Sequence, residues 1–174
     1  MKITAVPVMA AAVTLFAARP LLNRAMHDPT PALVALFGAL LVLGLAWPLT
    51  SQRPRDVVVV LALGLAAFAF GRLVSGHAPP APTARVVLLA SLAAVAEEAF
   101  FRRFVYAVLD IGGAALAVGG STLLFALAHV TVYGWWVLPL DLAAGLVLSW
   151  QRWASGTWKV PAATHLVANL LVVL

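Results

Sequence analysis

Apolar runs, each about as long as a membrane span, follow one another along almost the whole chain, with short proline-rich or charged stretches between them. Of the 174 residues, 64% are hydrophobic and only 10% are charged. Because a helix needs about 20 apolar residues to cross the hydrocarbon core, six or seven spans would use almost the entire chain. We therefore expect an all-α, polytopic membrane helical bundle that forms a single domain over residues 1–174.

The breaks between the apolar runs define the candidate spans. Proline and charge interrupt the hydropathy at "ARPLLNRAMHDPTP", "PLTSQRPRD" and "SGHAPPAPTAR". The first run resembles either a membrane helix or a cleaved signal peptide, and we expect a membrane helix. The predicted spans are residues 3–18, 31–49, 56–74, 86–109, 112–132, 135–150 and 157–174. The tryptophans expected at interface depth are Trp135, Trp136, Trp150, Trp153 and Trp158.

Charge and cysteine content narrow the range of partners. The net charge of +5 comes mainly from Lys and Arg in short connections, which favours contact with lipid headgroups and not with nucleic acid. The absence of cysteine excludes disulfides and thiolate metal sites. Internal repeats are not evident, so the sequence does not support an inverted-repeat transporter. The distribution of Lys and Arg leaves the membrane orientation open.

Four charges interrupt the apolar run "AVAEEAFFRRF", residues 94–104. Each charge near the bilayer centre costs about 2.5 to 3.5 kcal/mol on insertion scales, which makes such residues functional candidates. Glu98 and Arg102 are four apart with the acid first, the favoured order for an ion pair on one helical face. Glu97 points about 100° away, without a counter-charge on its own helix, and is the candidate general base. Arg103 is expected to extend to lipid phosphate, and a headgroup position for the whole cluster remains an alternative.

Two further apolar runs carry polar residues at helical spacing. Phe125 and His129 are four apart in "FALAH", and His165 and Asn169 are four apart in "HLVAN". Either histidine alone could be an ordinary hydrogen-bonded core residue. Together with Glu97 they supply a base for water, imidazoles that hold or donate protons, and an amide that stabilises an oxyanion. The combination predicts a hydrolytic site inside the bundle.

The ordered segments "EEAFFR", "FALAH" and "HLVAN" resemble the motifs EExxxR, FxxxH and HxxxN of the CPBP family, the CAAX proteases and bacteriocin-processing enzymes also called Abi proteins. The resemblance covers residues 86–174, the expected catalytic core, and leaves residues 1–85 as peripheral N-terminal helices. It implies an integral, multi-pass intramembrane protease of the glutamic type in the cell membrane. Its substrate would be a membrane-embedded or lipidated protein, cut near the C-terminal tail.

The resemblance also implies a role for each motif position. Glu97 matches the glutamate that activates water with the help of His129, while His165 and Asn169 match the pair that stabilises the oxyanion. Arg103 departs from the glycine that often follows the motif arginine, which puts the local helix geometry in question. The positions expected to support the site are Glu98, Arg102 and Phe125.

Two other enzyme mechanisms would use residues of the same region. Glu97, His129 and His165 could instead hold zinc, with an open position for water. The sequence has no HExxH motif, and we expect no metal or other cofactor. A serine protease built on Ser121 in "VGGSTL" is the weaker alternative, since glycines beside a serine are common where membrane helices pack closely.

A role without turnover is the principal alternative to proteolysis. The same polar core would serve a binding or immunity-type membrane protein of this family. A proton-coupled transporter would also use buried Glu and His, but matching broken helices are not evident. Asp141, in the sixth predicted span, has no role in either scheme, and we expect it either at the interface or along the substrate path.

Overall fold

The regular elements are all helical in the computed structural model, which describes residues 2–46, 54–76 and 83–173. This confirms the predicted all-α class. The longer helices are α1 (Lys2–Ala25), α2 (Thr30–Ala46), α3 (Val57–Ser75), α4 (Ala84–Glu98), α6 (Ala114–Tyr133), α7 (Leu138–Ser155) and α8 (Lys159–Val173). The shorter elements are a π-helix (Ala99–Val105), α5 (Tyr106–Leu109) and the 3₁₀ turns Asp110–Gly112 and Trp135–Val137.

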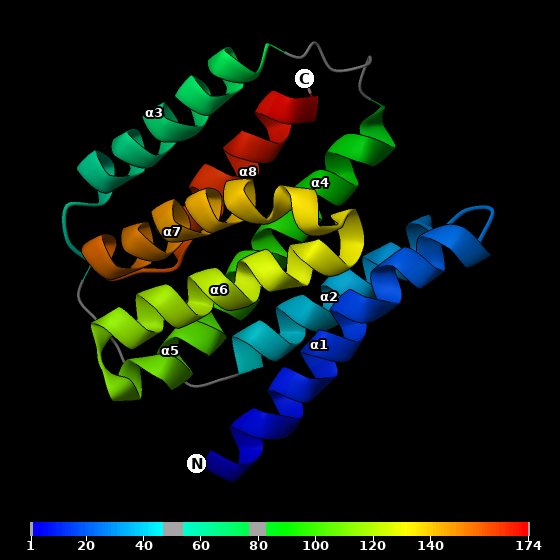
Figure 1. Ribbon diagram of the computed structural model, residues 1–174, viewed down its shortest axis with the longest axis horizontal. Helices are drawn as coiled ribbons and strands as arrows, with labels where there is room; N and C mark the ends of the chain where they lie inside the picture. Colours follow the sequence, from blue (N-terminus) through cyan, green and yellow to red (C-terminus); the bar gives the residue numbers. More distant parts are fainter. Residues whose placement is uncertain (1, 47–53, 77–82, 174) are drawn as a thin grey trace.

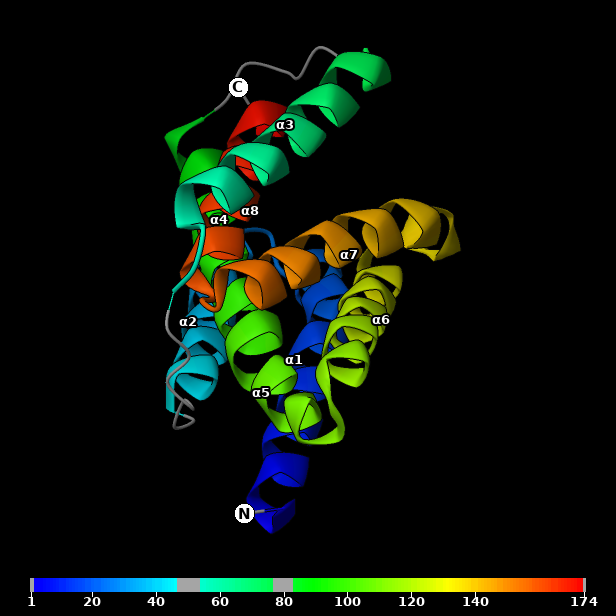
Figure 2. The same ribbon diagram turned by 90° about the vertical axis from the view of Figure 1, so that its left-hand side faces the viewer.

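Consecutive long helices run in alternating directions, so the connections gather at two ends of the bundle (Figure 1). α6 packs against α7, α4 against both α2 and α8, and α3 covers α7 and α8. α7 and α8 diverge from the turn that joins them, with α3 on the same side of the bundle (Figure 2). This divergence places α3, α6, α7 and α8 around the cavity described below.

Two helix ends differ from the sequence-based expectation. α1 does not stop near residue 18 but continues through Pro20 to Ala25. A proline removes one hydrogen bond, and neighbouring helices can compensate for that loss within an apolar bundle. α7 extends to Ser155 and not to residue 150, because Gln151 and Arg152 are buried by packing against other helices. The first and sixth helices are therefore longer than the spans predicted for them.

The number of membrane crossings is not confirmed. Within the described residues, only α3 and α6 are long and apolar enough to pass a composition test for a membrane span. α2 and α8 are apolar but shorter. The predicted breaks at "PLTSQRPRD" and "SGHAPPAPTAR" lie largely outside the described residues.

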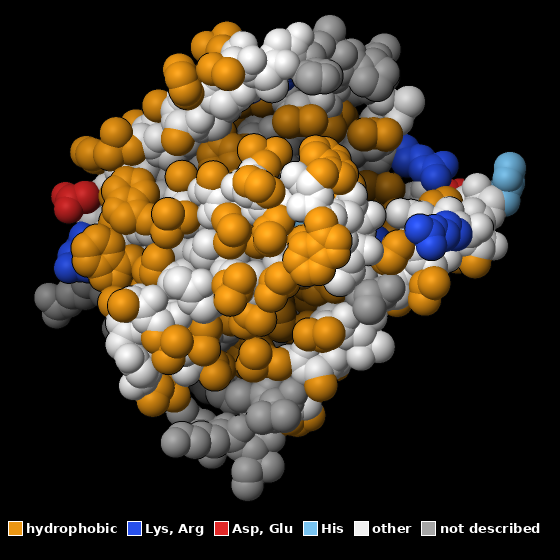
Figure 3. Space-filling model, in the orientation of Figure 1, with side chains coloured by type: hydrophobic (Ala, Val, Ile, Leu, Met, Phe, Trp, Pro, Cys, Tyr) orange, Lys and Arg blue, Asp and Glu red, His pale blue; other side chains and the backbone are white. Residues whose placement is uncertain are grey.

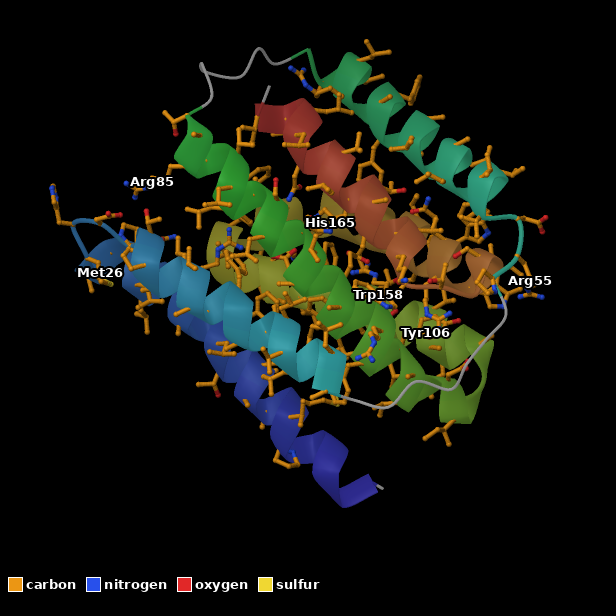
Figure 4. The ribbon with its side chains drawn as sticks, turned by 180° about the vertical axis from the view of Figure 1, so that it is seen from behind. Met26, Arg55, Arg85, Tyr106, Trp158 and His165 are labelled. Atoms are coloured by element: carbon orange, nitrogen blue, oxygen red, sulfur yellow. The ribbon has the colours of Figure 1, made fainter. Side chains whose placement is uncertain are left out.

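One face of the molecule is apolar over its middle and charged near its edges (Figure 3). Figure 3 shows hydrophobic side chains spread across the exposed face, with charged groups confined to the periphery. Figure 4 shows His165 in the middle of the bundle, Arg85 and Met26 at one end and Arg55 toward the other. His165 therefore lies far from both charged ends, at a depth where polar groups need partners within the protein.

Candidate active site

A π-helix follows the paired glutamates. α4 ends at Glu98, and the backbone continues without a break as the π-helix Ala99–Val105. π-Helical segments within α-helices are rare and are frequently found at functional sites. Arg103, which departs from the motif pattern, lies in this π-helix, where the local helix geometry was in question. The wider turn still keeps Arg102 beside Glu98.

Arg102, Glu98 and His165 form one buried chain of hydrogen bonds. Arg102 is 0% exposed, donates from Nη1 to Glu98 Oε1 at 3.1 Å, and donates from Nη2 to the Gly145 carbonyl at 3.0 Å. The same Glu98 oxygen lies 2.9 Å from His165 Nδ1. The spacing predicted the contact between Glu98 and Arg102, but not the contact between Glu98 and His165. Glu98 therefore links the arginine of one helix to the imidazole of another.

Phe125 packs at the centre of this chain. The Arg102 guanidinium lies 4.4 Å from the centroid of the Phe125 ring, within the range of a cation–π contact. The Phe125 and His129 ring centroids are 4.3 Å apart, and the His165 ring meets the edge of Phe125 at 5.9 Å. One aromatic side chain thus fixes the positions of both imidazoles and of the buried arginine.

Glu97 faces both histidines across short gaps. Its side chain is 3% exposed, and Oε2 lies 3.7 Å from His129 Nε2 and 4.0 Å from His165 Nε2. These separations exceed a direct hydrogen bond and are suited to a bridging water. His129 Nδ1 lies 3.0 Å from the Phe125 carbonyl. A proton on Nδ1 therefore satisfies that carbonyl and leaves Nε2 to face Glu97.

Arg19 of α1 completes the surroundings of Glu97, and sequence reasoning missed it. Its Nη1 lies 3.8 Å from Glu97 Oε1, and its Nη2 donates to the Tyr133 hydroxyl at 3.2 Å. The guanidinium also lies 5.3 Å from the centroid of the Phe37 ring. Among the described residues Glu97 forms no ion pair within its own helix, as expected, and α1 supplies its counter-charge instead. The signal was a lone arginine near the end of an apolar run.

A cavity of about 480 Å³ opens beside the histidines, between α3, α6, α7 and α8. His129, His165 and Asn169 line it, and most of the remaining lining is apolar, as in many ligand pockets. Asn169 donates one amide hydrogen to the Ala90 carbonyl at 3.1 Å and has a second hydrogen to offer. Asp141 also lines this cavity, and both of its expected positions, at the interface or along a substrate path, stay predictions.

Arg103 makes a different contact from the one expected. Its guanidinium donates to the backbone carbonyl of Gly44, in the last turn of α2. Carbonyls in the last turn of a helix lack partners within the helix, so this bond satisfies one of them. This bond uses one guanidinium nitrogen, and the contact of Arg103 with lipid phosphate stays a prediction.

Comparison with known families identifies the chain. A family model described as type II CAAX prenyl endopeptidase Rce1-like matches residues 79–171. The chain belongs to this family. The match confirms the resemblance drawn from the three motifs, and it indicates a membrane-integral protease. No curated protein and no solved structure matches the chain significantly.

The structure does not arrange the residues considered for a zinc site as a set of metal ligands. Zinc takes nitrogen and oxygen ligands at about 2.0 to 2.2 Å in a tetrahedral arrangement. Among the described residues, no group of three His, Asp or Glu side chains is arranged to hold a metal ion, and this includes Glu97, His129 and His165. We therefore derive no step of the reaction through a metal.

Ser121, the basis of the serine-protease alternative, lies in the packing surface between α6 and α7. It is fully buried, and its hydroxyl lies 2.9 Å from the Ser149 hydroxyl, which also accepts a bond from Thr122 at 3.1 Å. These small polar residues join α6 to α7 at a close packing surface, as interhelical Ser and Thr do in membrane bundles. In this family member, Ser121 contributes to packing.

Proposed function

We propose that this protein is a multi-pass intramembrane endopeptidase that cleaves near the C-terminal tail of a membrane-embedded or lipidated protein. The observation that carries the proposal is the position of Glu97, buried and within 4.0 Å of the Nε2 atoms of both histidines. A carboxylate and two imidazoles whose polar atoms lie within reach of one bridging water are the groups that hydrolysis requires. Family membership supports the same class of reaction.

In the proposed reaction, Glu97 accepts a proton from a water held between its carboxylate and His129. The water oxygen attacks the scissile carbonyl carbon, and the carbonyl π electrons move to oxygen. When this tetrahedral intermediate collapses, the C–N bond breaks and the leaving nitrogen takes the proton from Glu97. Atoms and charge balance with water as the only co-reactant.

His165 and Asn169 are the proposed oxyanion donors. The Glu98 carboxylate, 2.9 Å from His165 Nδ1, accepts the Nδ1 hydrogen and orients the ring so that Nε2 faces the reaction space. Donation to the oxyanion then uses a hydrogen on Nε2. The second amide hydrogen of Asn169 supplies another donor on the same face of α8. Donors fixed in advance inside an apolar bundle stabilise developing negative charge more strongly than donors in water.

The depth of the site favours a substrate that is already in the membrane. His165 lies in the middle of the bundle, and the cavity beside it is lined mostly by apolar side chains (Figure 4). A tail attached to a lipid or a membrane helix reaches this depth with little desolvation of charge. The alternating helix directions agree with the expected six or seven crossings, with the lipid bilayer around the bundle (Figure 1).

The experiment compares protein termini in host membranes that carry the wild-type protein, Glu97→Gln or Asp28→Asn at matched expression. Asp28 is an exposed carboxylate outside the site and serves as the matched control. We expect mass spectrometry to find a defined set of new C-terminal peptides with the wild type and Asp28→Asn, and to find them lost with Glu97→Gln. Identical profiles for all three would contradict proteolysis and favour a binding role.

A further inference from the structure

A single cation lines the wall that α3 contributes to the cavity. Arg72 lies in the last turn of α3 and lines the same cavity as His165 and Asn169. α3 precedes residues 79–171, so Arg72 is outside the part of the chain that the family model matches. Its presence is a property of this chain that the three motifs do not explain.

One hydrogen bond holds the Arg72 guanidinium in place and leaves its two terminal nitrogens available to a ligand. Nε donates to the Leu171 carbonyl near the end of α8 at 2.9 Å. No acidic residue in the described part of the chain forms an ion pair with Arg72. The two terminal nitrogens of an arginine form a planar fork that matches the two oxygens of a carboxylate.

The other charges on the cavity wall determine where an anion can bind. Asp141, on α7, also lines the cavity, and its Oδ2 is buried without a hydrogen-bond partner. A carboxylate on the ligand is attracted to Arg72, whereas Asp141 offers it no cation. A bound peptide with a free C-terminus is therefore expected to direct that end toward α3.

The distance between His165 and Leu171 along α8 matches the length of a short extended peptide. Leu171 follows His165 by six residues, which is about 9 Å along a helix that rises about 1.5 Å per residue. An extended peptide covers about 3.3 to 3.6 Å per residue, so about three residues span this distance. A C-terminal carboxylate at Arg72 would place the third peptide bond from the end near the histidines.

We propose that Arg72 binds the free C-terminal carboxylate of the substrate and so sets the length of the tail that is released. This inference rests on the proposed peptidase function and names a specificity-determining residue for it. The alternative is a purely structural role, in which Arg72 only satisfies the Leu171 carbonyl. A structural role would affect every substrate alike, whereas carboxylate binding affects only substrates that carry the carboxylate.

The test uses the full-length protein in liposomes and two farnesylated CAAX peptides that differ only at the C-terminus, one a free carboxylate and one a carboxamide. We expect wild-type kcat/KM to favour the carboxylate peptide by about tenfold to a hundredfold, the range for hydrogen bonds to a charged group. Arg72→Gln should reduce this preference to within about twofold, mainly through KM on the carboxylate peptide. Arg72→Lys should keep part of it, since the charge remains but the fork is lost.

Arg85→Gln is the matched control, because Arg85 is an exposed arginine that does not line the cavity. It should keep the wild-type preference. The assignment of Arg72 fails if Arg72→Gln lowers both activities equally or keeps the wild-type preference. If the wild type cleaves both peptides equally well, carboxylate recognition fails while the proposed function stands. If it cleaves neither, the proposed function fails and the role of Arg72 fails with it.

Discussion

Gly44 of α2 lies against the backbone of Ala99, the first residue of the π-helix, so closely that a Cβ atom on Gly44 would overlap the Ala99 carbonyl group. Backbone atoms cannot move aside as a flexible side chain can. α2 therefore approaches the segment after the paired glutamates at a distance that only glycine permits.

Gly44→Ala is expected to lower the free energy of unfolding by about 1 to 3 kcal/mol, the usual range for overpacking a close contact. Gly38 lies on the same helix with open space around the position of its Cβ atom. Gly38→Ala should therefore be neutral or stabilising by up to about 1 kcal/mol. Unfolding of both variants in detergent provides the measurement, and equal effects would contradict the close packing of α2.

Arg102→Met should be one of the most destabilising substitutions in the chain. It leaves Glu98 buried with one fewer donor, and removing one partner of a buried ion pair costs about 3 to 5 kcal/mol. Adding Glu98→Gln should restore part of this loss, because the unpaired charge is then gone. Unfolding of the two single variants and the double variant measures the coupling, and strictly additive losses would contradict a direct pair.

Arg19→Gln should lower kcat/KM by about tenfold or more, since Arg19 lies 3.8 Å from Glu97 and helps to hold its carboxylate in place. Arg19→Lys should have an intermediate effect, because it keeps the charge and loses the planar guanidinium. Arg24→Gln, a change to an exposed arginine on the same helix, should be neutral. Peptidase assays on the three variants test this, and equal activity in Arg19→Gln and Arg24→Gln would be inconsistent with it.

Peptidase activity should persist after prolonged treatment with EDTA or 1,10-phenanthroline followed by removal of the chelator. The described residues present no group of three ligands for a metal, and the proposed steps use only side chains and water. Activity before and after treatment is the measurement. Loss of activity that returns with added zinc would revise the mechanism.

Contacts within one helix could be predicted from the sequence, whereas contacts between helices could not. A spacing of four residues places two side chains on one helical face, which is why Glu98 and Arg102, and Phe125 and His129, meet as expected. The position of Arg19 depends on how α1 packs against α2 and α6, and helical periodicity contains no information about that packing. The continuation of α1 past Pro20 likewise depends on its neighbours.

The contacts of Glu97 and Glu98 were also only partly predictable from the sequence. Helical geometry indicated that Glu97 and Glu98 point in different directions and therefore have different surroundings. It assigned Glu98 to Arg102 alone, because His165 is 67 residues away along the chain. The structure brings the two together through the packing of α8 on α4, so Glu98 both pairs with the arginine and orients an imidazole.

The cavity wall is built from two parts of the chain, and only one of them lies within the family match. α6, α7 and α8 up to residue 171 lie within the family match, and α6 and α8 contribute the histidines. α3 lies before the match and contributes Arg72. Bond cleavage and tail selection are thus encoded in separate segments. Exchanging α3 alone should redirect the enzyme to different tails while hydrolysis is preserved, which makes this helix the natural unit for engineering.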